Sequence, residues 1–292
     1  MNPFIRKLRF GLTRLGFGLA GRVSPRRTGQ ALAARFLLPQ GAGRALAAKA
    51  MANVGDGLRG GLTAGGARLA TYQWGDPAAD PYVLFSHGWS SFGLRFADWV
   101  PRLRAMGYAV VSFDQRGHGL SDGASSSLPD FVSTLRAIGL HFGRPAAVVG
   151  HSMGAASVVL AAETAWRPER FVLIAPLLDI ERSARLFVGF MGAPETVFPH
   201  FEDAVSGWAK ARFSDLDVAS RLPQMKAPLL VIHDRRDRET PWEDGKRYSE
   251  NWPGGRLFTT EGLGHNRLVD HPSVMEKALA FLSEEAREKA TS

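Results

Sequence analysis

The chain of 292 residues contains no cysteine. A disulfide framework, a thiolate-ligated zinc or iron–sulfur site and a cysteine nucleophile are therefore excluded. No apolar run of about 18 residues is free of charge, so the sequence predicts no membrane-spanning helix. A third absence is local, because the first 50 residues carry ten Lys and Arg side chains and no acidic one.

The positive charge of the chain belongs to this N-terminal leader. The remaining 242 residues hold 26 Lys and Arg against 28 Asp and Glu. A basic groove for nucleic acid is thus not indicated, and we expect no nucleic-acid partner. A signal peptide is not favoured either, since Arg14 interrupts the apolar run and more cations follow where cleavage would occur. We expect a cytoplasmic protein.

Residues 1–54 read as a basic, helical N-terminal extension. Six apolar side chains of its first helix fall within an arc of about 100°: Phe4, Ile5, Leu8, Leu12, Leu15 and Leu19. Two interpretations stay open. The helix lies on an anionic membrane surface through residues 1–22, or its apolar stripe packs on the protein's own body or on a partner chain.

Six glycines crowd into the twelve positions from Gly55 to Gly66. Such density predicts a loop or hinge, and we interpret residues 55–67 as a linker between extension and body. Gly55, Gly57 and Gly60 match the letters of a dinucleotide-binding motif. They follow no strand-like run, so the geometry that cradles a phosphate has no scaffold and no cofactor is expected.

From about residue 68 short apolar runs alternate with helical segments. The runs cover 68–74, 82–86, 108–113, 146–149, 171–174, 229–232 and, more weakly, 256–259. Continuous apolar runs of this length indicate strands buried on both faces. We therefore predict an α/β fold with a mostly parallel central sheet and helices on both faces, over 68–176 and 226–288. Ligands of such sheets bind beyond the carboxyl ends of the strands.

The strongest motif is Gly150-His151-Ser152-Met153-Gly154, which lies between a strand-like run and a helix-like run. This context predicts a nucleophile elbow, a sharp turn that raises the Ser152 hydroxyl above the sheet. Side chains two residues to either side would collide with the strand and the helix, which explains the two glycines. The free N–H groups of the helix that follows favour developing negative charge.

A serine hydroxyl needs a base, and the base needs an acid. His265, in a glycine-flanked loop before the last helix, is the best candidate base; His271 is the second. Asp237, after the strand at 229–232, is the candidate acid. Asp179, after the strand at 171–174, is a geometric alternative. Asp234 reads as structural, and no motif accompanies the His233/Asp234/Asp237 cluster that would make it a metal site.

The order Ser152, Asp237, His265 is that of the α/β-hydrolase superfamily, and residues 68–288 resemble it. The branch that they resemble most is that of esterases and monoacylglycerol lipases. Four segments carry the resemblance: His87-Gly88-Trp89, Asp114 to Gly123, Gly150 to Gly154, and Gly264-His265. It implies that the backbone N–H groups of Trp89 and Met153 form the oxyanion hole, without metal or cofactor.

The chain departs from that pattern at two places. His233-Asp234 stands where His-Gly is common, which concerns the local turn, and Ala155 stands where a second glycine usually follows the elbow. Residues 177–225 interrupt the alternation and are rich in large apolar side chains. By the resemblance they form a helical cap over the active site, which favours an acyl or aromatic substrate.

A serine nucleophile points to acyl transfer through an ester intermediate. We expect hydrolysis of short- to medium-chain or monoacylglycerol-like carboxylic esters. The same three residues also serve acyl transfer, perhydrolysis or C–C bond hydrolysis, which stay open. A binding protein on a hydrolase fold is the third alternative.

Overall fold

The computed structural model describes residues 3–162 and 166–290, with side chains for 8–52, 54–162 and 166–284. The chain divides into two compact units. The helical unit comprises Met1–Leu38 and Asp179–Asp217, and the sheet unit comprises Pro39–Leu178 and Val218–Ser292. Within the described ranges, no helix combines the length and apolar character that crossing a bilayer requires.

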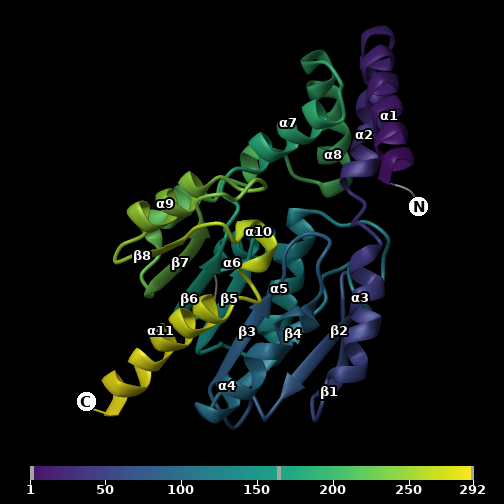
Figure 1. Ribbon diagram of the computed structural model, residues 1–292. Helices are drawn as coiled ribbons and strands as arrows, with labels where there is room; N and C mark the ends of the chain where they lie inside the picture. Colours follow the sequence, from purple (N-terminus) through teal and green to yellow (C-terminus); the bar gives the residue numbers. More distant parts are fainter. Residues whose placement is uncertain (1–2, 163–165, 291–292) are drawn as a thin grey trace. The chain divides into compact units, whose positions relative to one another are not determined.

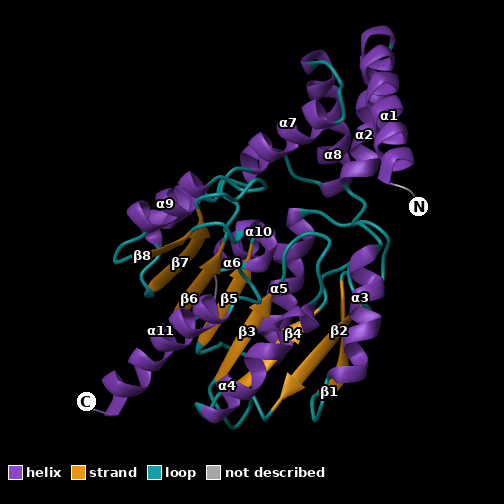
Figure 2. Ribbon diagram, viewed as in Figure 1, coloured by secondary structure: helices purple, strands orange, loops and turns teal. Residues whose placement is uncertain are grey.

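The sheet unit is built on eight strands in the order β1-β2-β4-β3-β5-β6-β7-β8 (Figure 2). Their bounds are β1 Leu58–Ala64, β2 Ala67–Trp74, β3 Tyr82–Ser86, β4 Ala109–Phe113, β5 Ala147–His151, β6 Arg170–Ile174, β7 Leu229–Asp234 and β8 Arg256–Thr260. The six strands β4-β3-β5-β6-β7-β8 are parallel to one another. Strand β2 is antiparallel to both β1 and β4. Strands β3 to β7 are buried throughout, as their continuous apolar runs require. The predicted mostly parallel sheet is confirmed.

Helices connect these strands. Those of the sheet unit are α3 Ala42–Ala50, α4 Val100–Ala105, α5 Leu128–Phe142, α6 Met153–Ala161, α9 Trp242–Asn251, α10 Gly264–Arg267 and α11 Pro272–Ala290. Helix α5 begins where Ser127 accepts a hydrogen bond from the Asp130 N–H, and it ends at Gly143, whose φ is 80°. A 3₁₀ helix, Gly93–Trp99, leads directly into α4.

The glycine-rich segment is not a simple linker, because most of it forms strand β1. This strand lies at the edge of the sheet and pairs antiparallel with β2. A Cβ at Gly60 would lie 2.7 Å from Oγ1 of Thr71, and one at Gly61 would lie 2.8 Å from Nε of Arg68. These glycines therefore leave room for side chains of β2. The glycine count predicted a loop wrongly, since pairing across the sheet outweighs a weak local strand propensity.

The helical unit joins residues 1–38 of the predicted extension with residues 179–217 of the predicted insertion. Its main helices are α1 Pro3–Val23, α2 Pro25–Phe36, α7 Ile180–Phe190 and α8 Phe198–Ala209 (Figure 1). A Cβ at Gly29 of α2 would lie 2.7 Å from the backbone nitrogen of Phe201, so the two helices touch along their backbones. The Phe36 ring lies 5.2 Å from that of Phe187 and 5.3 Å from that of Phe201.

The expected helix of the leader is α1, and its leucine side chains stay exposed. Leu8 to Leu19 of the stripe are between 54% and 60% accessible. The side chains of Phe4 and Ile5 lie outside the described ones. Within the helical unit, α1 packs through another face, which carries Gly18 and Gly21.

Candidate active site

Ser152 occupies the turn between β5 and α6. Its φ of 55° and ψ of −121° lie outside the regions that residues with a Cβ prefer, a strain of about 1–3 kcal/mol that the surroundings must hold. The Ser152 N–H donates to the carbonyl of Ile174 on β6 at 3.0 Å, and the Ser152 carbonyl accepts from Ala156 on α6 at 3.2 Å. The elbow is thus tied to the neighbouring strand and to its own helix.

The two glycines of the motif are where the chain has no room for a side chain. A Cβ at Gly154 would lie 2.4 Å from the carbonyl oxygens of Ser86 and His87, and one at Gly150 would lie 2.8 Å from Cα of Ala155. The steric reason that the motif suggested is therefore confirmed at both positions.

We expect Gly154→Ala to lower the free energy of unfolding by about 3 kcal/mol or more, because backbone of β3 must move to admit the methyl group. Gly207→Ala on α8 is the matched control. Nothing lies within 4 Å of a Cβ there, so the better helix propensity of Ala stabilises it by up to about 1 kcal/mol. Urea denaturation measures both, and a neutral Gly154→Ala would contradict the close packing.

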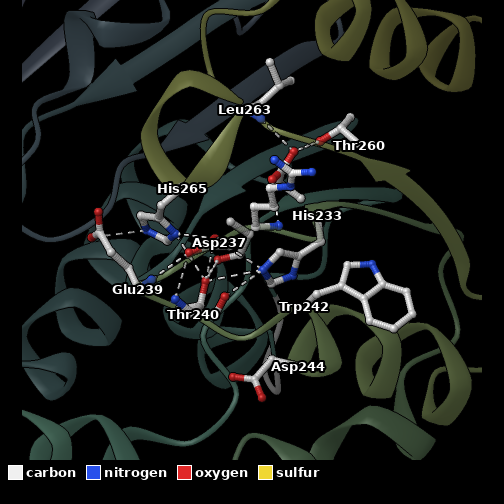
Figure 3. A network of polar contacts seen from close by, with 12 residues as sticks. His233, Asp237, Glu239, Thr240, Trp242, Asp244, Thr260, Leu263 and His265 are labelled. Atoms are coloured by element: carbon white, nitrogen blue, oxygen red, sulfur yellow. Dashed lines mark hydrogen bonds and ion pairs between the residues drawn. The ribbon is translucent and has the colours of Figure 1, made fainter.

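The candidate base and acid meet directly. His265, on α10, directs Nδ1 at Oδ2 of Asp237 over 2.7 Å (Figure 3). Both side chains are buried, with 5% and 0% exposed. A neutral His265 that donates from Nδ1 has its lone pair on Nε2, the nitrogen that a general base uses. Thr240 lies beside both, its Oγ1 3.1 Å from the Asp237 carboxylate and 3.2 Å from Nδ1 of His265.

Asp237 has a second histidine neighbour that the sequence did not mark for this role. Nε2 of His233, at the end of β7, lies 3.3 Å from Oδ2 of Asp237 and 3.1 Å from the Thr240 carbonyl. Burial by itself would raise the pKa of Asp237, but the hydrogen bonds from His233 and His265 hold it well below its usual range. The carboxylate therefore stays charged beside the imidazole.

The turn that carries His265 is anchored by Asp234, the last residue of β7. Its carboxylate accepts hydrogen bonds from the Thr260 hydroxyl at 2.7 Å and from the N–H of Leu263 at 2.9 Å. The N–H of Gly262 donates to it at 3.2 Å. The structural interpretation of Asp234 is confirmed, since a glycine here would leave these donors without their acceptor.

The alternative base and acid lie in other surroundings. Asp179 precedes α7 in the helical unit and accepts a hydrogen bond from the Arg182 N–H at 2.8 Å, as an N-cap. His271 precedes α11, and its Nδ1 lies 2.8 Å from the Ser273 hydroxyl. In the part of the chain that the structure describes, no group of His, Asp and Glu side chains gathers as it would for a metal ion.

Ser152 and His265 line one pocket of about 310 Å³ in the sheet unit. Its other lining residues come from the extension, from the loop and 3₁₀ helix after β3, from the elbow, from the loop that carries the acid and from α10: Gln40, Leu46, Trp89, Ser90, Ser91, Phe92, Arg95, His151, Glu239 and Asn266. The lining mixes apolar with charged side chains. Nothing in the motif pattern marked Gln40 and Leu46, which belong to the N-terminal extension.

Helix α3 is held against the pocket loop by its backbone and by one arginine. A Cβ at Gly43 would lie 2.3 Å from the Ser90 carbonyl oxygen, and the Gln40 N–H donates to Oγ of Ser90 at 2.8 Å. Arg44 donates to the carbonyls of Gly119 and Ser121, each at 3.1 Å. Residues 39–50 therefore belong to the pocket wall, not to a separate leader.

The backbone N–H groups of Trp89 and Met153 are the ones that the sequence assigned to the oxyanion hole by resemblance. Within the described residues, neither donates a hydrogen bond to another group. Trp89 lies after β3, on the connection that leads to β4, and Met153 is the first residue of α6, which follows β5. Strands β4 and β5 lie on opposite sides of β3. The loop before Trp89 is fixed by His87, whose Nδ1 donates to the Gly88 carbonyl at 2.8 Å and whose Nε2 accepts from the Gln115 N–H.

His151, the variable letter of the elbow motif, contacts the candidate base. Its Nε2 lies 3.2 Å from the His265 carbonyl oxygen, and the two rings are 4.7 Å apart. A histidine in the elbow was a signal of its own, but its partner 114 positions later in the chain could not be identified from spacing.

Three buried histidines make stability depend on pH. Burial lowers the pKa of His87 to about 4 and that of His118 to about 3, and it holds the pKa of His151 well below its usual value. In the unfolded chain their pKa is about 6.5, so the unfolded state binds more protons below that pH and stability falls on acidification.

The loss is on the order of 1 kcal/mol for each histidine at about pH 5.5 relative to about pH 7.5, and a few kcal/mol in all. Burial raises the pKa of Asp114, which acts in the opposite direction and offsets part of it. Urea denaturation at the two pH values measures the difference. A protein that is more stable at the acidic pH would contradict buried, neutral histidines.

A serine on a strained strand–helix turn of a mostly parallel sheet, followed in the chain by an acid and a histidine that meet, defines the α/β-hydrolase class. Comparison with known proteins agrees. Residues 77–215 match the family model described as serine aminopeptidase, S33, and residues 204–291 match that of TAP-like proteins. The chain belongs to the α/β-hydrolase superfamily.

Individual relatives are distant. A non-heme chloroperoxidase of Streptomyces lividans is 25% identical over 75% of this chain and 98% of its own length. A bifunctional esterase/perhydrolase of Acinetobacter calcoaceticus is 27% identical over 72% and 94%. The solved structure of a Pyrococcus furiosus esterase covers 80% of this chain and 94% of its own, with 21% identity and a TM-score of 0.61, and shows the same fold.

Proposed function

We propose that this protein is a serine hydrolase that cleaves carboxylic esters through an acyl-enzyme intermediate. The 2.7 Å contact between Asp237 Oδ2 and Nδ1 of His265, which lines the same pocket as Ser152, carries the proposal. In this scheme Ser152 Oγ attacks the ester carbonyl while His265 Nε2 takes its proton. His265 then gives that proton to the leaving alcohol, and the second half of the cycle repeats the steps with water.

The surroundings support a role for each remaining group. Asp237 stays ionised, so it stabilises the imidazolium that forms on His265. The N–H groups of Trp89 and Met153 are available to hold the negative charge on the carbonyl oxygen, where each donor contributes about 3 kcal/mol in enzymes of this type.

The pocket favours short acyl groups. Its volume of about 310 Å³ lies at the small end of ligand pockets. Leu46 and Phe92 offer apolar contact to an acyl or alkyl group, while Gln40, Arg95 and Glu239 offer polar contacts. We therefore expect acetyl and butyryl esters to react faster than long-chain ones.

Labelling with a fluorophosphonate, followed by hydrolysis of a p-nitrophenyl ester series and of monoacylglycerols, tests this function. Stable labelling of one serine and turnover that falls with acyl length are the expected results. Absence of both labelling and hydrolysis at every chain length would refute the proposal.

A second candidate is perhydrolysis, which the printed activity of the Acinetobacter calcoaceticus relative favours. It uses the same acyl-enzyme and replaces water with hydrogen peroxide as the acceptor. Product analysis with an ester and peroxide together separates the two, since peracid forms only in the second case.

A further inference from the structure

One face of α1 presents large apolar side chains to the surroundings. The exposed fractions are 54% for Leu8, 60% for Leu12, 60% for Leu15, 57% for Leu19 and 87% for Val23. At about 100° per residue these five positions span an arc of about 80°. Such a stripe normally faces a protein core, so its exposure needs a reason.

The stripe is not the face through which α1 packs in the helical unit. A Cβ at Gly21 would lie 2.6 Å from Pro194, and one at Gly18 would lie 3.1 Å from the Gly192 carbonyl oxygen. These glycines let α1 approach the segment between α7 and α8 closely. The helix thus packs through the face that carries Gly18 and Gly21, and the leucine side chains remain exposed.

Exposed apolar side chains gather in this unit. Of the twelve large ones found among the described side chains, nine belong to it: Leu8, Leu12, Leu15, Leu19, Val23, Leu38, Leu186, Phe190 and Trp208. The sheet unit, which is much larger, has three. Concentration of this kind is typical of a surface that binds something apolar.

Charge indicates what that something is. The first 50 residues carry ten cations and no acid. Arg9 and Arg22 lie to either side of the stripe at helical spacing, and both residues are exposed. We propose that α1 docks in the plane of an anionic lipid bilayer, with its leucine stripe in the acyl boundary and the flanking arginines at the phosphates.

A second copy of the chain fits this surface less well. Leu8 to Leu19 span less than two heptads, whereas a coiled coil needs about three or four. Pairing two such helices would also bring like-charged arginines together. The stripe itself offers a partner protein only aliphatic side chains, without the Trp and Tyr anchors of strong protein interfaces. A lipid surface needs no such anchors.

Co-sedimentation of the full chain with phosphatidylcholine vesicles, with and without phosphatidylglycerol, tests the proposal. We expect binding to the anionic vesicles to be at least about tenfold stronger and to weaken with salt. The double variant Leu12→Glu/Leu15→Glu should bind at least about a hundredfold more weakly than the wild type.

Leu140→Glu is the matched control, because Leu140 is 89% exposed on α5 of the sheet unit. It should bind as the wild type does, and thermal melting shows that both variants are folded. Equal binding of all three proteins, or no binding of the wild type to either vesicle, would overturn the proposal. So would a wild-type dimer in sedimentation velocity that the double variant abolishes, since the stripe would then serve a second copy.

Discussion

Ser152→Ala is expected to lower kcat for ester hydrolysis by about 10⁶-fold, the loss typical of removing a serine nucleophile. Ser152 sits on the elbow and lines the pocket, and the next residue, Met153, has a backbone N–H that donates to no acceptor among the described residues. Alanine removes one oxygen and leaves the backbone bonds of the turn in place, so the protein should fold. Steady-state kinetics on p-nitrophenyl butyrate measures the loss.

Ser91→Ala controls for the loss of any serine from the same pocket. Its kcat should stay within a few-fold of wild type, and fluorophosphonate should still label it. If Ser152→Ala retained more than about a hundredth of the activity and the label, the nucleophile would be another residue, and the function proposed above would lose its chemistry.

Asp237→Asn should lower kcat by about 10⁴-fold with little change in KM. Asp237 accepts from Nδ1 of His265 and so places the His265 lone pair on Nε2. An amide group can donate instead, and His265 would then take the tautomer whose Nε2 carries a proton and cannot act as a base. The pocket itself is unchanged, which is why binding should survive.

Glu239→Gln is the control for charge alone. Glu239 is 60% exposed and lies 3.8 Å from Nε2 of His265, so its carboxylate is close to the imidazole but largely screened by water. We expect its kcat to stay within a few-fold of wild type. A larger loss of kcat in Glu239→Gln than in Asp237→Asn would mean that Glu239, and not Asp237, is the acid that acts on His265.

The strands could be predicted from the sequence because a buried strand is marked by a run of consecutive apolar residues. Runs such as 82–85 and 229–232 are apolar without interruption, which is typical of strands buried on both faces. The candidate nucleophile was predictable because its motif is five consecutive residues between a strand-like run and a helix-like run. Of its two glycines, Gly150 avoids Ala155 nearby in the chain, whereas Gly154 avoids the distant carbonyls of Ser86 and His87.

The residues that contact the candidate acid and base could not be predicted from the sequence. The contacts of Asp237 with His233 and Thr240 are short-range, but their geometry follows from the turn after β7 and not from a motif. The contact of His151 with the His265 carbonyl joins two loops 114 residues apart. Periodicity carries no information about which loops meet in space.

The N-terminal region shows most clearly which features follow from the sequence and which follow only from tertiary packing. Composition and helical spacing established a basic helix with an apolar stripe, because both are properties of consecutive residues. Only packing established that residues 1–38 fold with the insertion, that α3 lines the pocket and that the glycine-rich segment pairs as β1. Those outcomes depend on which surfaces of distant segments fit together. At Gly29 and Gly43 the contact is made by the backbone, and a residue without a side chain adds nothing to the apolar pattern of the sequence.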